Sequence, residues 1–172
     1  MTPAVGGHVV GIDMGSPVGL RAPRRIEDLR WVQPRANPWP KSRLRGSRAA
    51  GLRYQRAVAR AIPVARADEW FEFLDRHGVG CCSPDLILVG SRLVFALECK
   101  LTAVPQADAQ LAGLYLPVLA HHFGREARGI VVVRHLRPQV DLSRVRADLK
   151  SCIRDATGAY FPILHWLGRG PI

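Results

Sequence analysis

Two apolar runs around a short turn constrain the fold of this chain more than any other feature. Residues 85–89 (DLILV) and 92–101 (RLVFALECKL) flank Gly90-Ser91, a dipeptide that suits a two-residue hairpin turn. Residues 85–89 and 93–97 are apolar at nearly every position instead of at alternate positions. Because such strands are covered on both faces, we expect them inside a sheet with helices on either side.

The rest of the chain alternates between helical and strand patterns. Helical segments have apolar residues three and four positions apart, and strand segments are rich in β-branched and aromatic residues. We therefore expect an α/β fold of order α-β-β-β-α-β-α-β, with a central mixed sheet of about five strands flanked by helices. The predicted elements are helix 42–62, strands 69–74, 85–89 and 92–101, helix 106–123 with a bend at Pro117, strand 129–134, helix 142–155 and strand 161–167.

Residues 1–41 differ in composition from the rest of the chain. They are rich in Gly, Pro and Arg and show no sustained period, so we expect a basic arm that precedes a domain of residues 42–172. Trp31 and Trp39 in this arm would either stack on nucleic-acid bases or pin the arm to the domain.

The formal net charge of +11 is concentrated at one end of the chain. Residues 1–66 carry 13 Lys and Arg against three acids, a net charge of +10, which leaves +1 for the remaining residues. A biased codon usage would explain the preference for Arg over Lys, but not this crowding. We therefore expect a polyanionic partner, most simply nucleic acid. The candidate phosphate-binding residues are Lys41, Arg43, Arg45, Arg48, Arg53 and Arg56.

Several classes of protein are disfavoured. No run approaches the roughly 18 consecutive apolar residues of a membrane span, and residues 1–17 lack the pattern of a secretory signal. We expect a cytoplasmic protein with no membrane partner. The chain has no P-loop or dinucleotide-binding glycine motif, so we expect no small-molecule cofactor. The four cysteines form no CxxC pair and are interpreted as buried reduced thiols.

Three charged residues converge at one end of the predicted hairpin. With Gly90-Ser91 as the turn, Asp85 pairs with Ala96, and Glu98 becomes its diagonal neighbour at about 7–8 Å between α-carbons. Side chains alternate between faces along a strand, so Asp85, Glu98 and Lys100 share one face.

Two neighbouring carboxylates beside an apolar core predict a metal site. Hard oxygen ligands favour Mg²⁺ or Mn²⁺, with water and a substrate phosphate in the remaining positions. Such an ion would lower the pKa of a bound water, and Lys100 would orient the nucleophile or neutralise charge on the phosphate. The alternative is a plain strand-end salt bridge of Lys100 with Glu98 or Asp85. The rarity of lysine, three of the 25 basic residues, favours a specific role.

The spacing of these residues resembles the signature of a nuclease superfamily. The run SPD, ending at Asp85, followed by ECK from Glu98 is similar to the signature of the PD-(D/E)xK nucleases. Within that superfamily, ECKLT followed by Gln106, Gln110 and Tyr115 is similar to archaeal and phage Holliday-junction resolvases and related phage nucleases. The resemblance covers roughly residues 43–135 and implies a restriction-endonuclease-like core.

The resemblance also implies an activity and a set of roles. It implies metal-dependent hydrolysis of DNA by an endonuclease, with branched DNA as the first expected substrate, in the cytoplasm of a prokaryotic or phage-infected cell. A resolvase cuts two strands symmetrically, which implies a homodimer. The implied metal ligands for Mg²⁺ or Mn²⁺ are Asp85, Glu98 and the Cys99 carbonyl, and the implied catalytic lysine is Lys100.

Glutamines occupy the supporting positions of this motif. Gln110, or Gln106, would support the site or contact the substrate. The first helix of such nucleases often brings a glutamate in a G-x-x-x-E-like context, whereas this chain has Gly51 followed by Gln55. Gln55 can coordinate through its carbonyl oxygen but adds no negative charge. This departure keeps open a non-catalytic nucleic-acid-binding protein, or a phage assembly protein, on a degenerate nuclease fold.

Overall fold

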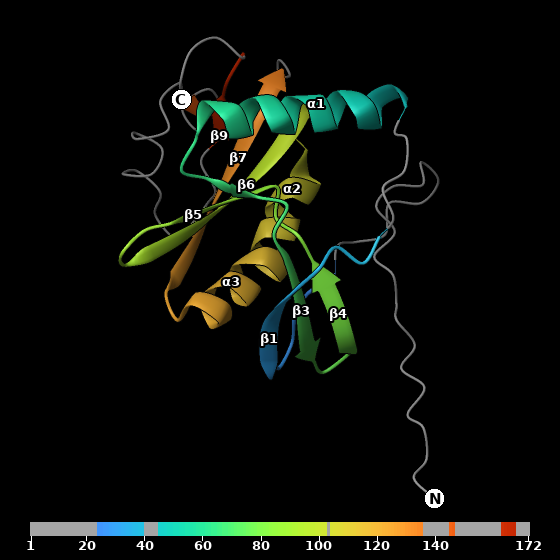
Figure 1. The fold of residues 1–172 in the computed structure, drawn as a ribbon, viewed down its shortest axis with the longest axis vertical. Helices are drawn as coiled ribbons and strands as arrows, with labels where there is room; N and C mark the ends of the chain where they lie inside the picture. Colours follow the sequence, from blue (N-terminus) through green and yellow to red (C-terminus); the bar gives the residue numbers. More distant parts are fainter. Residues whose placement is uncertain (1–23, 40–44, 103, 136–144, 147–162, 168–172) are drawn as a thin grey trace, which may run out of the picture.

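A computed structural model describes residues 24–39, 45–102, 104–135, 145–146 and 163–167 (Figure 1). They form a mixed α/β fold with two sheets. The elements in chain order are β1 (Trp31–Arg35), α1 (Gly46–Ala61), β2 (Arg66–Ala67), β3 (Trp70–Asp75), β4 (Gly78–Cys82), β5 (Leu86–Val89), β6 (Leu93–Thr102), α2 (Pro105–Gln110), the π-helical turn η1 (Leu111–Tyr115), α3 (Leu116–Phe123), β7 (Glu126–His135), β8 (Val145–Arg146) and β9 (Ile163–His165).

The larger sheet has the strand order β2-β5-β6-β7-β9-β8. β2, β5 and β6 are antiparallel neighbours, and β6, β7, β9 and β8 are parallel neighbours. The connection from β6 to the parallel strand β7 runs through α2, η1 and α3, as a parallel pair requires. The expected mixed sheet is therefore present, with six strands in place of about five.

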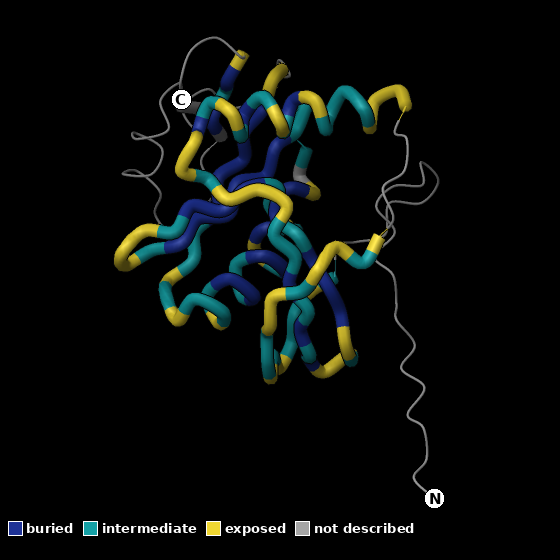
Figure 2. The backbone as a smooth tube through the Cα atoms, viewed as in Figure 1, coloured by how far each residue is buried: buried dark blue, intermediate teal, exposed yellow. Residues whose placement is uncertain are grey.

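The inner strands of this sheet are covered on both faces, as their composition predicts. One face of β5 and β6, which includes Leu88 and Leu97, packs with Tyr54 and Val58 of α1. The opposite face packs with the helical connection between β6 and β7, and its cluster includes Ile87. Figure 2 shows the centre of the molecule as buried, with exposed residues on the outer side of α1.

The smaller sheet, β1-β3-β4, was not expected from the sequence. Residues 31–35, predicted to lie in an arm outside the domain, pair antiparallel with β3, and residues 78–82, for which no element was predicted, form β4. β3, predicted within the central sheet, belongs to this smaller sheet. Burial alternates along it, with Phe71 and Phe73 buried, and these two side chains join the core beneath α3. Pro34 hides β1 from sequence inspection, but an edge strand tolerates a proline.

A buried carboxylate fastens the N-terminal segment to this sheet. Asp75 is 2% exposed and accepts hydrogen bonds from Arg24 Nη2, from the backbone N–H of His77 at 2.9 Å and from the backbone N–H of Glu27 at 3.4 Å. The Arg30 N–H also donates to the Leu74 carbonyl at 2.8 Å. Residues 24–30 are therefore an integral part of the fold.

The helical connection contains a π-helical turn immediately before its proline. Pro117 has no N–H and would clash with the carbonyl four residues earlier, which belongs to Gly113. That carbonyl instead accepts a hydrogen bond from the Ile26 N–H at 2.7 Å. The helix continues through the irregularity because η1 closes with an i→i+5 bond, from the Leu116 N–H to the Leu111 carbonyl. A π-helical turn thus precedes Pro117, where a bend was predicted, and the carbonyl that the proline leaves free binds the N-terminal segment.

The C-terminal part of the prediction is only partly within the described residues. Of the helix predicted over 142–155, only Val145–Arg146 is described, and it is a strand parallel to β9, so the helix is wrong there. Sheet pairing overrides a weak local helical preference. Ile163–His165 lies inside the predicted strand 161–167. No helix of the described residues is long and apolar enough to cross a membrane.

Candidate active site

The hairpin of β5 and β6 places Asp85 beside Glu98. The turn is Ser91-Arg92, closed by a hydrogen bond from the Gly90 N–H to the Leu93 carbonyl at 2.9 Å, so the predicted register was wrong by two residues. A shift of two keeps every side chain on its predicted face, whereas a shift of one would reverse them. Asp85 directly precedes the pair Leu86↔Leu97. Continuing the register by one step places it opposite Glu98 instead of diagonal to it.

Two hydrogen bonds, each between a side chain and a backbone group, hold Asp85 in this place. Its Oδ2 accepts from the Cys99 N–H at 2.7 Å, and its backbone carbonyl accepts from Gln55 Nε2 of α1 at 3.2 Å. Gln55 thus contacts Asp85 through its amide nitrogen, whereas the role considered from the sequence was coordination through its carbonyl oxygen.

Glu98 is the most enclosed carboxylate of the site. It is 2% exposed, and its Oε1 forms an ion pair with Lys100 Nζ at 2.5 Å. Its Oε2 is buried and has no hydrogen-bond partner among the described residues. The plain salt bridge that the sequence left open is therefore present, but it satisfies only one of the two oxygens.

The electrostatics of the site reflect two acids sharing one lysine. Burial raises the pKa of Asp85 well above its usual value, and the nearby charge of Glu98 raises it further. Burial also raises the pKa of Glu98, although Lys100 opposes the change. For Lys100, burial lowers the pKa, but the charges of Glu98 and Asp85 outweigh it and the net shift is upward. Lys100 thus provides one positive charge for the two carboxylates.

The helical connection contributes Gln110 and Tyr115 to the same side of the sheet. Gln110 Nε2 donates a hydrogen bond to the Tyr115 hydroxyl. Burial raises the pKa of Tyr115, and the charges of Glu98 and then Asp85 raise it further, so its phenol lies within the field of both acids. The i→i+5 bonding of η1 brings residues five positions apart onto one face of the helix. Gln106 is exposed on α2.

Tyr115 was part of the resemblance, but no role at the site was predicted for it. Its position on the apolar face of the predicted helix indicated a core residue, and it is indeed buried. Its approach to the acids depends on the π-helical turn, which a regular helical period does not reveal. Pro117 two residues later was the available signal of a disturbed helix.

The predicted phosphate-binding residues lie partly within the described chain. Arg45, Arg48, Arg53 and Arg56 are exposed at or on α1, and none of them forms an ion pair with another described residue. The sequence of α1 contains no acidic residue. Lys41 and Arg43 lie outside the described residues. α1 therefore presents uncompensated positive charge, and Gln55 connects it to Asp85.

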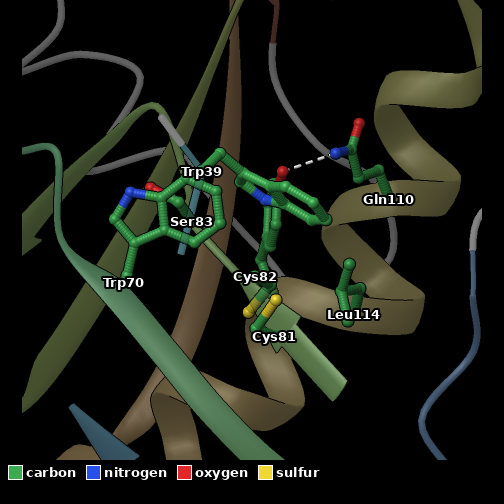
Figure 3. A pocket seen from close by; sticks show the side chains of 8 residues that line it. Trp39, Trp70, Cys81, Cys82, Ser83, Gln110 and Leu114 are labelled. Atoms are coloured by element: carbon green, nitrogen blue, oxygen red, sulfur yellow. Dashed lines mark hydrogen bonds between the residues drawn. The ribbon is translucent and has the colours of Figure 1, made fainter. Parts of the chain in front are cut away.

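A hollow lined in part by Tyr115 lies near Asp85 in the chain, since Ser83 in its lining precedes Asp85 by two residues (Figure 3). Its lining combines residues from the segment after β1, from β3, from the end of β4 and from the helical connection. Figure 3 shows Gln110 and Leu114 on the helix and Trp70 on the opposite side. The lining residues are Trp39, Trp70, Cys81, Cys82, Ser83, Gln110, Leu114 and Tyr115.

The donor set is small. Within the part of the chain that the structure describes, no three or more His, Cys, Asp or Glu side chains gather closely enough to hold a metal ion. Two carboxylates are nevertheless enough for Mg²⁺, which usually retains several waters and binds through one or two carboxylates. The unpartnered Oε2 of Glu98 fits such an ion.

Comparisons of the chain with family models, with curated proteins and with solved structures found no match.

Proposed function

We propose that this protein is a metal-dependent DNA endonuclease on a restriction-endonuclease-like core. The observation that carries the proposal is the pairing of Asp85 with Glu98, whose Oε2 is buried without a partner. The ion pair with Lys100 satisfies only the other oxygen of Glu98, and a buried polar atom without a hydrogen-bond partner lowers the stability of the protein. Such a group is best explained by a cation that the site is built to receive.

The carboxylates of Asp85 and Glu98 would hold Mg²⁺ or Mn²⁺, with the Cys99 carbonyl as a further ligand. When bound, the ion would supply Lewis-acid stabilisation of the charge that develops on the scissile phosphate. The Cys99 N–H holds one oxygen of Asp85, so this carboxylate is oriented before any ligand arrives. The Cys99 thiol faces the core on the α1 side of the sheet and takes no part.

Lys100 acts as a positive charge and hydrogen-bond donor. Its pKa is raised, so the ammonium stays protonated at neutral pH and cannot serve as a general base. Its side chain is 30% exposed, which leaves it accessible to a substrate phosphate or an attacking water. Lys100 would thus orient the nucleophile and neutralise charge on the phosphate.

The exposed arginines of α1 would bind the DNA backbone. Arg48, Arg53 and Arg56 carry charge that no described carboxylate compensates, and contacts of this kind are salt-dependent and largely independent of sequence. Through Gln55 the same helix contacts the carbonyl of Asp85. The helix that would bind the DNA backbone and the residue that would hold the metal are therefore in direct contact through Gln55.

Cleavage of labelled DNA tests this proposal. Four-way-junction, flap and linear substrates are incubated with Mg²⁺ or Mn²⁺, and the wild type is compared with Glu98→Gln and Lys100→Met. We expect cutting that requires the metal and falls by at least about a hundredfold in both variants, as for loss of one group stabilising transition-state charge. The matched control is Glu126→Gln, which breaks an ion pair with Arg128 of the same two-residue spacing on the neighbouring strand β7.

A non-catalytic nucleic-acid-binding protein is the second candidate. The observation that favours it is Gln55, which donates to a carbonyl where a glutamate would bring a charge. Binding of all three DNA substrates without cutting under either metal would favour this candidate over the nuclease. Gel filtration with and without junction DNA would test the homodimer that symmetrical cutting needs.

A further inference from the structure

We infer that the hollow beside the acids binds an unpaired nucleobase of the DNA strand, so that the protein acts on substrates with single-stranded nucleotides next to the cleaved bond. The inference rests on the proposed function for the class of substrate. It depends on the aromatic side chains that line the hollow, on the polar groups that face it and on its place next to Asp85.

Two tryptophans give the hollow its aromatic character. Trp39 is 43% exposed, although a large apolar side chain is normally covered, and Trp70 of β3 is half-buried. Indole faces stack on nucleobases of any sequence, and each stacked base contributes substantially to the affinity for single strands. Inside a duplex the faces of each base are covered by its neighbours, so an unpaired base offers Trp39 a free face that an internal base pair does not.

Trp39 is held in place by a local hydrogen bond. The Asn37 side-chain oxygen accepts from the Trp39 N–H at 2.8 Å, which closes an Asx turn, and Pro38 between them restricts the backbone. An exposed indole on a restrained backbone loses little conformational entropy when a base stacks on it.

Polar groups complete the lining. Gln110 uses one amide N–H for the Tyr115 hydroxyl, and its amide oxygen and second N–H have no partner among the described residues. Ser83 adds a hydroxyl on the β4 side of the hollow. An amide and a hydroxyl can bond to the Watson–Crick edge of a base without demanding one sequence, because both can donate and accept.

The hollow is close enough to the acids for a base and its own phosphate to bind together. Ser83 lines the hollow and precedes Asp85 by two residues, a span of at most about 7 Å between α-carbons. Tyr115 also lines the hollow and lies within the field of Asp85 and Glu98. The cations of α1 supply the charge complementarity that a DNA strand requires.

Binding without metal tests the inference apart from catalysis. In EDTA, the full chain is titrated with a short single-stranded oligonucleotide, an abasic strand of the same length and a blunt duplex. The variants are Trp39→Ala and Trp39→Phe, and the control is Val64→Ala, which truncates an 80% exposed apolar side chain that does not line the hollow. Because Trp39 is partly exposed and lies outside the buried core, its replacement should leave the fold intact, and circular dichroism checks this.

We expect Trp39→Ala to weaken binding of the single strand by about tenfold, to leave the abasic strand and the duplex unchanged, and to be largely rescued in Trp39→Phe. Equal affinity of Trp39→Ala and wild type for the single strand, or an equal loss on the abasic strand, would overturn the inference. Metal-dependent cutting together with unaltered single-strand binding in Trp39→Ala would mean that the protein is a nuclease but that the hollow does not bind a base. Base-dependent binding without cutting under Mg²⁺ or Mn²⁺ would mean that the hollow binds a base although the protein is not a nuclease.

Discussion

The Cys99 backbone N–H donates to Oδ2 of Asp85 at 2.7 Å, and this bond ties the residue before β5 to the strand that carries Glu98. The two acids are therefore kept together by the backbone, despite the repulsion between their charges. The bond stabilises the charged form of Asp85, yet burial and the charge of Glu98 outweigh it and raise its pKa. The fold thus holds two like charges together, and the cation that we propose would stabilise this arrangement.

Asp85→Asn should abolish metal-dependent stabilisation while preserving the fold. The asparagine oxygen can still accept from the Cys99 N–H, but the charge that attracts a cation is gone. At a Mn²⁺ concentration of ten times Kd, wild type should gain about 1.4 kcal/mol in free energy of unfolding, and the variant nothing. Thermal melting with and without Mn²⁺ measures this. Glu126→Gln, at an exposed acid, should respond to Mn²⁺ as wild type does.

The metal-free protein should lose stability as pH rises through the raised pKa of Asp85. In the unfolded chain this carboxyl titrates near pH 4, whereas in the folded protein its pKa is well above that value. Between the two the folded state binds more protons, so the free energy of unfolding falls with increasing pH. Urea unfolding in EDTA, from about pH 5 to about pH 8, should give wild type a more negative slope than Asp85→Asn. Equal slopes for the two proteins would show that the pKa of Asp85 is not raised in the folded state.

The shared face of the site residues was predictable, because the face that a strand residue occupies depends only on whether its position along the strand is odd or even. Asp85, Glu98 and Lys100 share a face whether the hairpin turn lies at residues 90–91 or 91–92, so the wrong turn did not disperse them. Apolar residues on both faces of β5 and β6 also indicated the covering helices correctly. The turn itself was missed because Gly90 suits more than one turn geometry.

The smaller sheet and the π-helical turn could not be predicted, because both depend on contacts between distant segments. β1 contains Pro34 and has no alternating pattern, and it forms a strand because β3 offers an edge to pair with. The Gly113 carbonyl is freed by Pro117 but satisfied only by Ile26, far away in the chain. The local sequence pattern of a segment does not identify the distant segment with which it pairs.

Asp75→Ala should destabilise the protein far more than Arg76→Ala, although the two residues are adjacent. Asp75 is fully buried, and its removal leaves the Arg24 guanidinium without its carboxylate, a change that typically costs about 3–5 kcal/mol. Arg76 forms an exposed ion pair with Glu27 at 2.7 Å, and such a pair contributes less than about 1 kcal/mol. Urea denaturation of both variants gives the comparison. Similar losses would contradict the role of Asp75 as the anchor of residues 24–30.

Arg53→Ala and Arg56→Ala should each weaken DNA binding uniformly across sequences. Each removes one phosphate contact, so the slope of log affinity against log salt concentration should become less steep by about one unit. Arg66→Ala is the control, since Arg66 is exposed but already lies 3.7 Å from the Glu69 carboxylate. Fluorescence anisotropy over a range of salt concentrations measures the slopes. Unchanged slopes in both α1 variants would place the DNA elsewhere on the molecule.

Pro117→Ala should release the N-terminal segment from the helix. An alanine at this position provides an N–H that can bond to the Gly113 carbonyl within a regular helix, and this donor competes directly with the Ile26 N–H. Since a hydrogen bond contributes about 1 kcal/mol, exchange of the Ile26 amide should accelerate by roughly fivefold.

A regular helix in Pro117→Ala would also turn Gln110 away from Tyr115, because residues five apart share a face only in the π-helical turn. Hydrogen exchange followed by NMR reports the first effect. Loss of single-strand binding without loss of the fold would report the second, because Gln110 and Tyr115 line the hollow together.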